Sequence, residues 1–368
     1  MTILPKPYNM RQFKTKSKLI YAILLLISLF IIHYYRNQRQ KFNNKMSKYD
    51  QIIDPYQQLH IIPNPDGSIT RLQEFFPAIS PSIDTSPALS KDVPLNPSNK
   101  TWVRIFLPRT AIDSSNPIAN KLPIVVFVHG GGFILYSAAS PVFHNFCSEL
   151  ASQLGVLVVA VEYRLAPESR LPAGYDDVLE ALLWVKDGKD EWVKKYGNFS
   201  RCVMMGQSAG ANIVYYAALK ALDQVNDLRP LTITDLVLIQ PFFGGLNRTG
   251  SELRLVNDPY LPLVGNDLVW SLALPVGADR GHEFCNPITH GGSEKLGQVR
   301  DLGWRVMVVG CDGDPLLDRQ VGLVKMLEEK GVIVKSMFSE GGHHGVFASD
   351  SSKRKMLFGV LEESLGNM

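Results

Sequence analysis

The sequence predicts an α/β protein built on a mostly parallel sheet. Short apolar runs rich in Val, Ile and Leu alternate with amphipathic stretches of helical length, from residue 122 to the end of the chain. Buried parallel strands have this continuous apolar character, and the intervening helices provide the crossovers. The composition agrees, because 45% hydrophobic and 20% charged residues are typical of a globular protein with a sizeable core.

The first 45 residues differ from the rest of the chain in charge. They contain many bases and no acid, and they account for the net charge of +3. The remaining residues, 46–368, are mildly acidic and form the predicted α/β domain. A general polyanion-binding surface is therefore not expected, and we predict no nucleic-acid partner.

Residues 19–35, "LIYAILLLISLFIIHYY", form an uncharged apolar run flanked by bases on both sides. This length meets the lower limit of about 17 residues for a spanning helix. No small-residue cleavage site follows, which disfavours a secretory signal. The run is a candidate membrane anchor for a domain that we expect to be cytoplasmic. The alternative is that residues 1–45 are an upstream extension, because Met46 opens a plausible chain start.

The predicted elements follow one another in a regular order. An N-terminal part has candidate strands at 68–75 and 101–108, separated by a Pro/Ser-rich connection over 77–98. The later predicted strands are 122–130, 156–164, 202–206, 235–241, 304–310 and 332–338, and the predicted helices are 142–155, 177–188, 209–225, 320–331 and 353–365.

One segment, 244–303, interrupts the alternation of strands and helices. It has a helical stretch over 266–275 within polar, Gly/Pro-rich surroundings, so we interpret it as an insertion over the sheet. Together with residues 46–98 it is expected to form a cap. Its apolar residues, including Trp270 and Leu272, suggest a fairly hydrophobic binding site.

The sequence "GQSAG", 206–210, lies between a predicted strand and a long predicted helix. A serine on such a sharp turn needs neighbours without bulky side chains, which Gly206 and Gly210 provide. The turn exposes the Ser208 hydroxyl next to the amino end of the helix. Ser208 is therefore a candidate nucleophile.

A nucleophilic serine requires a base and a group that orients the base. "GGHHG" follows the predicted strand 332–338, and "CDGDPLLD" follows the predicted strand 304–310. Both segments lie at the carboxyl edge of the predicted sheet, where ligands bind in open α/β proteins. The candidate bases are His343 and His344, and the candidate acids are Asp312, Asp314 and Asp318.

"HGGGF", 129–133, places nearly bare backbone after a buried strand. Attack of Ser208 on a carbonyl would create an oxyanion, and such a loop can offer it N–H donors. Loss of one donor typically costs about 2.7–4 kcal/mol of transition-state stabilisation. A phosphate-binding loop is rejected, because no lysine follows and the GxGxxG spacing is absent.

In combination and order, these motifs resemble the plant carboxylesterases of the hormone-sensitive-lipase branch of the α/β-hydrolases. The resemblance extends from about Tyr49 to the end of the chain. Besides the motifs above, it includes "EYRLAPE", "LPAGYDD", "WSLALPVG" and "GDPLLDRQ".

The resemblance implies the α/β-hydrolase fold and a carboxylesterase that forms an acyl-enzyme without metal or cofactor. The expected substrate is a small, fairly hydrophobic ester, for example an acetylated plant metabolite. By motif, the implied triad is Ser208, Asp314 and His344, and the implied oxyanion hole is Gly131, Gly132 and Ala209.

Two other roles stay open at this point. Some relatives with this fold retain the triad and act as lyases, cyclases or dehydratases of specialised metabolism. Others are hormone receptors that have lost the triad histidine, and the presence of His344 disfavours this role.

Three further residues have plainer interpretations. We expect Asp176 and Asp177 to begin and cap the helix that follows them, and Asp318 to cap the next-to-last helix.

Overall fold

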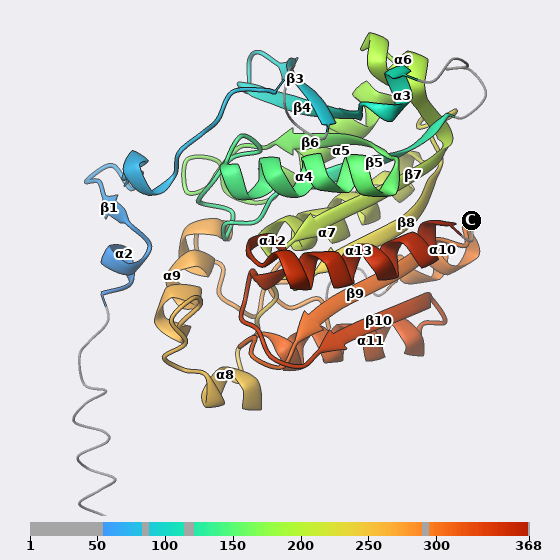
Figure 1. The fold of residues 1–368 in the computed structure, drawn as a ribbon. Coiled ribbons are helices and arrows are strands. Elements are labelled where there is room, and N and C mark those ends of the chain that lie inside the picture. The colour runs from blue at the N-terminus through green and yellow to red at the C-terminus, as the bar shows by residue number, and fades with distance from the viewer. Residues whose placement is uncertain (1–53, 83–87, 114–120, 289–293, 367–368) are drawn as a thin grey trace, which may run out of the picture. The chain divides into compact units, whose positions relative to one another are not determined.

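An eight-stranded sheet forms the centre of the computed structural model, which describes residues 54–82, 88–113, 121–288 and 294–366 (Figure 1). In spatial order the strands run β10-β9-β8-β7-β5-β6-β4-β3. Their bounds are β3 Ala88–Asn96, β4 Thr101–Pro108, β5 Leu122–Val128, β6 Leu157–Glu162, β7 Gly197–Gln207, β8 Ile233–Ile239, β9 Arg305–Cys311 and β10 Ile333–Ser339.

The sheet is mostly parallel, as the sequence predicts. Strands β5 to β10 all pair in parallel, whereas β4 pairs antiparallel with both β3 and β6. The central strands are buried on both faces, which explains their continuous apolar sequences.

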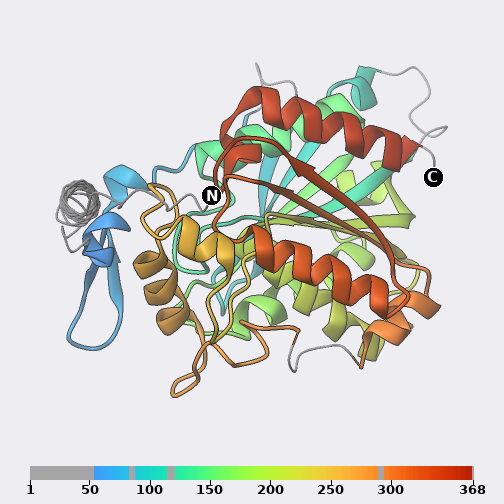
Figure 2. The same ribbon diagram turned by 90° about the horizontal axis from the view of Figure 1, so that it is seen from below.

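Helices cover both faces of the sheet (Figure 2). Helices α4, α12 and α13 lie on one face, and α5, α7 and α11 lie on the other, each layer packing its own apolar cluster against the strands. The bounds of the described helices in this body are α3 Thr110–Asp113, α4 Pro141–Leu154, α5 Ala173–Lys186, α6 Glu191–Tyr196, α7 Ala209–Ala221, α11 Leu317–Glu329, α12 Val346–Ser349 and α13 Ser351–Gly366, with a 3₁₀ turn at Leu222–Gln224.

Strand β3 corrects the prediction that residues 77–98 are only a connection. Nine of these residues form β3, the outermost strand of the sheet, which pairs with β4. The polar sequence and Pro94 hid this strand, but an edge strand needs only one row of ladder bonds, so a proline is tolerated there. This part of the predicted cap segment 46–98 therefore belongs to the central sheet.

The two remaining parts of the predicted cap lie near each other. The segment before β3 contains α2 (Pro55–Gln58), a hairpin of β1 (Ile61–Pro63) and β2 (Ile69–Arg71), and a 3₁₀ turn at Gln73–Phe75. The insertion contains α8 (Gly250–Arg254), α9 (Leu263–Ala273) and α10 (Leu296–Asp301). Because α2 packs beside α9, the two segments meet on one side of the body (Figure 1).

The candidate anchor at 19–35 lies outside the described residues. Within the part of the chain that the structure describes, no helix is both long and apolar enough to cross a bilayer.

Candidate active site

Ser208 occupies a strained turn between β7 and α7. Its φ of 54° and ψ of −121° are unusual for a residue with a side chain. A Cβ on Gly206 would lie 2.3 Å from the carbonyl oxygen of Gly210, and one on Gly210 would lie 2.1 Å from that of Val128. Glycine is therefore required at both positions. The close packing presents the serine hydroxyl at the carboxyl edge of the sheet.

A continuous chain of polar contacts joins the serine, a histidine and an aspartate. Ser208 Oγ lies 2.7 Å from His344 Nε2. His344 Nδ1 lies 3.1 Å and 3.0 Å from the two carboxylate oxygens of Asp314. Since the three residues follow β7, β9 and β10, the parallel sheet brings together positions more than a hundred residues apart. This arrangement can move a proton from a serine hydroxyl onto an oriented imidazole.

Asp314 is fully buried and yet favours its ionised form. Burial raises the pKa of this carboxyl, but the charge and hydrogen bond of His344, the backbone N–H of Leu316 and the amide of Gln320 outweigh it, so the pKa is lowered from its ordinary value. A carboxylate that stays ionised can stabilise an imidazolium beside it.

Two buried glutamines that the sequence did not identify donate hydrogen bonds to Asp314. Gln240 Nε2 and Gln320 Nε2 each lie 2.8 Å from Asp314 Oδ2. Gln240 directly follows β8, and Gln320 lies on α11. Gln240 has no motif around it, because its partner is 74 residues away. Gln320 ends the "GDPLLDRQ" motif, six residues from Asp314, but nothing in that motif identifies its side chain as a partner of the acid.

The glycine loop after β5 lies against the serine turn. A Cβ on Gly130 would be 3.2 Å from the Ser208 Cβ. Gly131 has a φ of 117° and Gly132 a φ of 62°, and neither amide donates a hydrogen bond to any residue that the structure describes. Ala209 is the first residue of α7, where an N–H has no intrahelical acceptor. The structure thus leaves all three predicted amides available near Ser208.

Buried side chains support this loop from behind. His129 Nδ1 lies 2.8 Å from the Gly130 carbonyl oxygen, and its ring stacks on Tyr163. Burial lowers the pKa of His129 to about 4, so the neutral imidazole donates through Nδ1. These contacts are consistent with a role in shaping the loop.

A pocket of about 610 Å³ opens over Ser208. None of the described residues that line it is Asp, Glu, Lys or Arg. Besides the serine with its neighbour Gln207, His344 and the glycine loop, the lining comes from four regions: Gln58, Leu59, His60 and Phe76; Leu135, Tyr136, Val142 and Phe143; Phe242, Pro259, Tyr260, Leu261 and Val269; and His343, Gly345, Ala348 and Ser349.

The apolar wall differs in detail from the sequence prediction. Trp270 is fully buried behind the pocket, where its ring stacks on Phe242, and neither it nor Leu272 lines the cavity. Val269 and Leu261 provide the apolar surface of the insertion instead. The prediction of a hydrophobic site from this segment holds, but the residues are shifted because the helix turns its largest side chain inward.

The expected caps at Asp176 and Asp177 are wrong. Helix α5 begins at Ala173, so both aspartates lie within it. Asp177 is fully buried and its carboxylate accepts hydrogen bonds from the backbone and side chain of Arg164, at 2.7–2.9 Å for the shortest contacts. The pair fastens the turn after β6 to α5.

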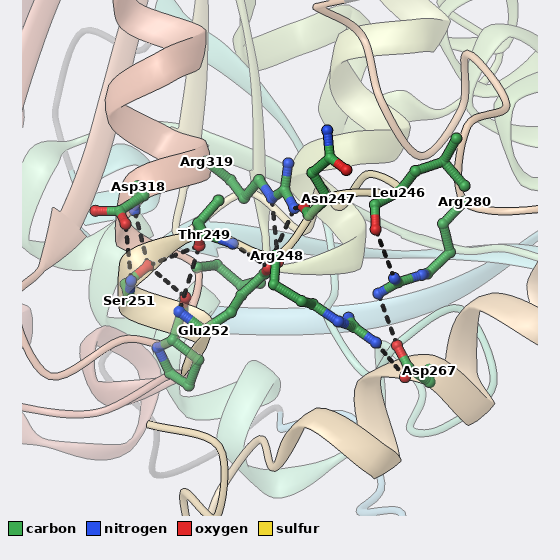
Figure 3. Close-up of polar contacts among 12 residues, drawn as sticks. Leu246, Asn247, Arg248, Thr249, Ser251, Glu252, Asp267, Arg280, Asp318 and Arg319 are labelled. Carbon is green, nitrogen blue, oxygen red and sulfur yellow. Dashed lines mark hydrogen bonds and ion pairs between the residues drawn. The ribbon is translucent and has the colours of Figure 1, made fainter. Parts of the chain in front are cut away.

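Asp318 is likewise not the cap of α11, which has Leu316 in that position. Figure 3 shows its side chain facing α8, where Asp318 Oδ2 accepts from the Ser251 N–H at 2.7 Å. Ser251 Oγ in turn donates to the carbonyl oxygen of Pro315 at 2.7 Å. The insertion therefore holds the turn that follows Asp314.

A second contact reinforces this attachment. Arg319 forms a paired ion contact with Glu252, both Nε–Oε1 and Nη2–Oε2 being 3.1 Å (Figure 3). The side chains are 10% and 1% exposed. Glu252 also completes a capping box with Thr249 at the start of α8.

Comparisons with known proteins agree with this geometry. Residues 125–348 match a family model described as the α/β hydrolase fold. The chain belongs to the α/β-hydrolase family.

Among the described residues, no group of three His, Cys, Asp or Glu is placed to hold a metal ion.

Within that family, the chain is similar to plant carboxylesterases. Carboxylesterase 20 of Arabidopsis thaliana is 49% identical over 316 residues, covering 85% of this chain and 97% of that protein. The 3-O-acetylpapaveroxine carboxylesterase CXE1 of Papaver somniferum is 47% identical over 326 residues, covering 86% and 98%. The sequence-based identification of the family is thus confirmed.

Solved structures support the same fold. The esterase of Pyrobaculum calidifontis superimposes with a TM-score of 0.63 over 76% of this chain and 85% of that chain, at 24% sequence identity.

Proposed function

We propose that this carboxylesterase cleaves small, fairly hydrophobic esters with Ser208 as nucleophile, His344 as base and Asp314 as the acid that orients it. The unbroken chain of contacts from Ser208 Oγ through His344 to Asp314, at 2.7 Å and 3.0 Å, carries the proposal. Its position at the base of an uncharged pocket adds support.

The reaction proceeds in two steps. His344 accepts the hydroxyl proton as Ser208 attacks the ester carbonyl, and Asp314 stabilises the resulting imidazolium. The imidazolium then protonates the leaving alcohol, which departs and leaves an acyl-serine. Water attacks this intermediate by the same route, so the acid is released and the free enzyme is regenerated.

The tetrahedral intermediates place negative charge on the former carbonyl oxygen. We assign its donors to the amides of Gly131, Gly132 and Ala209, none of which is needed for hydrogen bonds among the described residues. Because they are fixed before the reaction, they stabilise the charge without reorganising.

The pocket supports a neutral substrate. A cavity of about 610 Å³ without an ionised wall has room for an alcohol of metabolite size, but offers no partner to a charged one. The Papaver relative is named for an acetylated plant compound. We infer that acetyl esters of apolar plant metabolites are the substrate class.

The test compares the full chain with its Ser208→Ala variant on a chromogenic short-chain acyl ester. Turnover by the wild type, an acyl adduct on Ser208 in mass spectra, and a loss of kcat on the order of 10⁶-fold in the variant are expected. A neutral ester should be turned over faster than an acidic ester of equal length.

Absence of both turnover and acylation across several chain lengths would sink the esterase mechanism and leave a lyase or binding role. Faster turnover of the acidic ester would overturn the substrate class alone.

The candidate anchor at 19–35 adds a proposal about location, supported by its uncharged length and flanking bases. We expect a cytoplasmic catalytic domain attached to a membrane. In cell fractionation the full chain should sediment with membranes, whereas residues 46–368 should not. Equal distribution of the two forms would contradict the anchor.

A further inference from the structure

Gln240 occupies an unusual position directly after β8. It is fully buried and has a φ of 46°, which side-chain-bearing residues rarely adopt. Ser208, at the corresponding place after the neighbouring strand β7, shows the same feature. Strain of this kind persists only where surrounding contacts hold the residue in place.

The carboxamide of Gln240 uses its donors and its acceptor in three directions. Nε2 donates to Asp314 Oδ2 at 2.8 Å and to the carbonyl oxygen of His343 at 3.0 Å. Oε1 accepts from the N–H of Gly345 at 2.9 Å. His343 and Gly345 are the two neighbours of His344. One side chain thus joins the acid to the backbone on both sides of the base.

Gln320 provides an internal comparison. Its amide donates to the same oxygen, Asp314 Oδ2, at the same distance of 2.8 Å. Its Oε1 is buried and has no hydrogen-bond partner among the described residues. It therefore supports the acid but makes no hydrogen bond to the loop of His344.

We propose that Gln240 is a positioning residue that fixes the distance and orientation between Asp314 and His344. The proposal rests on the catalytic roles assigned above. The carboxyl end of β9 carries the acid, and the loop after β10 carries the base. Gln240 reaches both from β8, so movement of the loop would break hydrogen bonds to a buried amide, which is unfavourable without water to replace them.

The chemistry of the side chain matters as well as its shape. Asp314 is ionised and accepts only, so its neighbour must donate. A glutamate in place of Gln240 could donate to Asp314 only while protonated, and its other oxygen could still accept from Gly345. Once ionised, it would place a second negative charge against Asp314. Leucine fills the space but forms none of these hydrogen bonds.

The test uses the full chain with Gln240→Leu, Gln240→Glu and Gln320→Leu, measured on the same chromogenic ester. For Gln240→Leu we expect kcat to fall about 10²-fold, as for a small misplacement of reacting groups, with KM within about twofold of the wild type. Gln320→Leu removes one hydrogen bond to the acid and none to the loop of His344, so kcat should fall only about threefold.

The pH profile separates positioning from a purely structural role. The ratio of kcat in Gln240→Glu to kcat in the wild type should be highest at low pH and fall as the introduced carboxyl ionises. A packing defect gives a ratio independent of pH, and thermal unfolding of Gln240→Glu at each pH verifies that the variant is folded over the range compared. If Gln240→Leu fails to fold, as judged by thermal unfolding, this ratio decides the question.

Wild-type turnover and acylation of Ser208 are established first, and their absence defeats the proposed function itself. With an active wild type, a folded Gln240→Leu variant within threefold of its kcat, or a pH-independent ratio for Gln240→Glu, overturns the positioning role and leaves the esterase mechanism intact.

Discussion

The nucleophile and its partners are held in two different ways. Around Ser208, the geometry is imposed by backbone packing over a few residues, with Gly206 and Gly210 too close to other backbone for any side chain. Around Asp314 and His344, it is imposed by side chains from distant elements, among them Gln240 from β8 and Ser251 from α8. The first arrangement is visible as a motif, whereas the second exists only in the folded chain.

This difference predicts two kinds of sensitivity. At the serine, any added atom should be harmful, because space is the limiting factor. At the acid and base, loss of a polar partner should be harmful, because buried groups would be left unpaired. Substitutions of the two kinds can therefore break or sharpen the comparison.

Among these substitutions, the largest loss of unfolding free energy is expected for Arg319→Met, which removes the partner of the buried Glu252 carboxylate. Leaving one charge of a buried pair alone costs about 3–5 kcal/mol of unfolding free energy. Urea unfolding measures the loss. The control is Lys325→Ala, whose exposed pair with Glu329, 3.9 Å apart, should contribute about 0.3–0.5 kcal/mol at most. Equal losses of unfolding free energy in the two variants would show that the buried pair of Arg319 and Glu252 contributes no more than an exposed one.

Gly210→Ala should lower the unfolding free energy by about 3 kcal/mol and strongly reduce kcat, since the new methyl group meets the Val128 carbonyl oxygen at 2.1 Å. Gly359→Ala is the matched control on α13. Nothing lies within 4 Å of its added carbon, so helix propensity should raise stability by about 0.5–1 kcal/mol. A stable, active Gly210→Ala enzyme would show that space is not limiting at the serine.

The pH dependence of stability tests the segment that follows the glycine loop, because the Glu162 carboxylate accepts hydrogen bonds from Ser137 and Ala138 there. Burial raises the pKa of this carboxyl to about 7, despite hydrogen bonds from Ala138 N–H and Ser137 Oγ. Because the folded pKa lies above the unfolded one, the contribution to stability is fully present below about pH 4.5 and is lost as the pH rises through 7. Glu162→Gln should match the wild type at pH 4 and exceed it by about 2 kcal/mol at pH 8, a value reduced because 19% of the side chain is exposed. Identical pH curves of thermal unfolding would contradict the raised pKa.

The smallest effect is expected for Ser251→Ala. It removes the hydroxyl that donates to the Pro315 carbonyl and accepts from the Asp318 N–H. The unfolding free energy should fall by about 1–2 kcal/mol, and kcat should fall by a few fold while KM stays constant. An unchanged kcat would show that the turn after Asp314 does not depend on α8.

Prediction from sequence succeeded where the signal was local. Strands β5 to β10, their helices and the serine turn all follow from apolar runs and glycine spacing within a few residues. Prediction failed where the outcome depended on position in the folded chain and not on a local pattern. Strand β3 was missed because its polar sequence with Pro94 does not resemble a buried strand, whereas an edge strand tolerates both features. Asp177 was misassigned as a helix cap because nothing local identifies Arg164 as its partner.

By itself, the sequence determined the α/β architecture, the family and the residues expected to react, because periodicity and backbone-restricting glycines act over short distances. The tertiary structure alone decided which residues hold the acid and base together, which side chains line the pocket and which aspartates pair. Those outcomes depend on the order of strands in the sheet, which places β8 beside β9 and the insertion against α11, and so creates contacts between residues that are far apart along the chain.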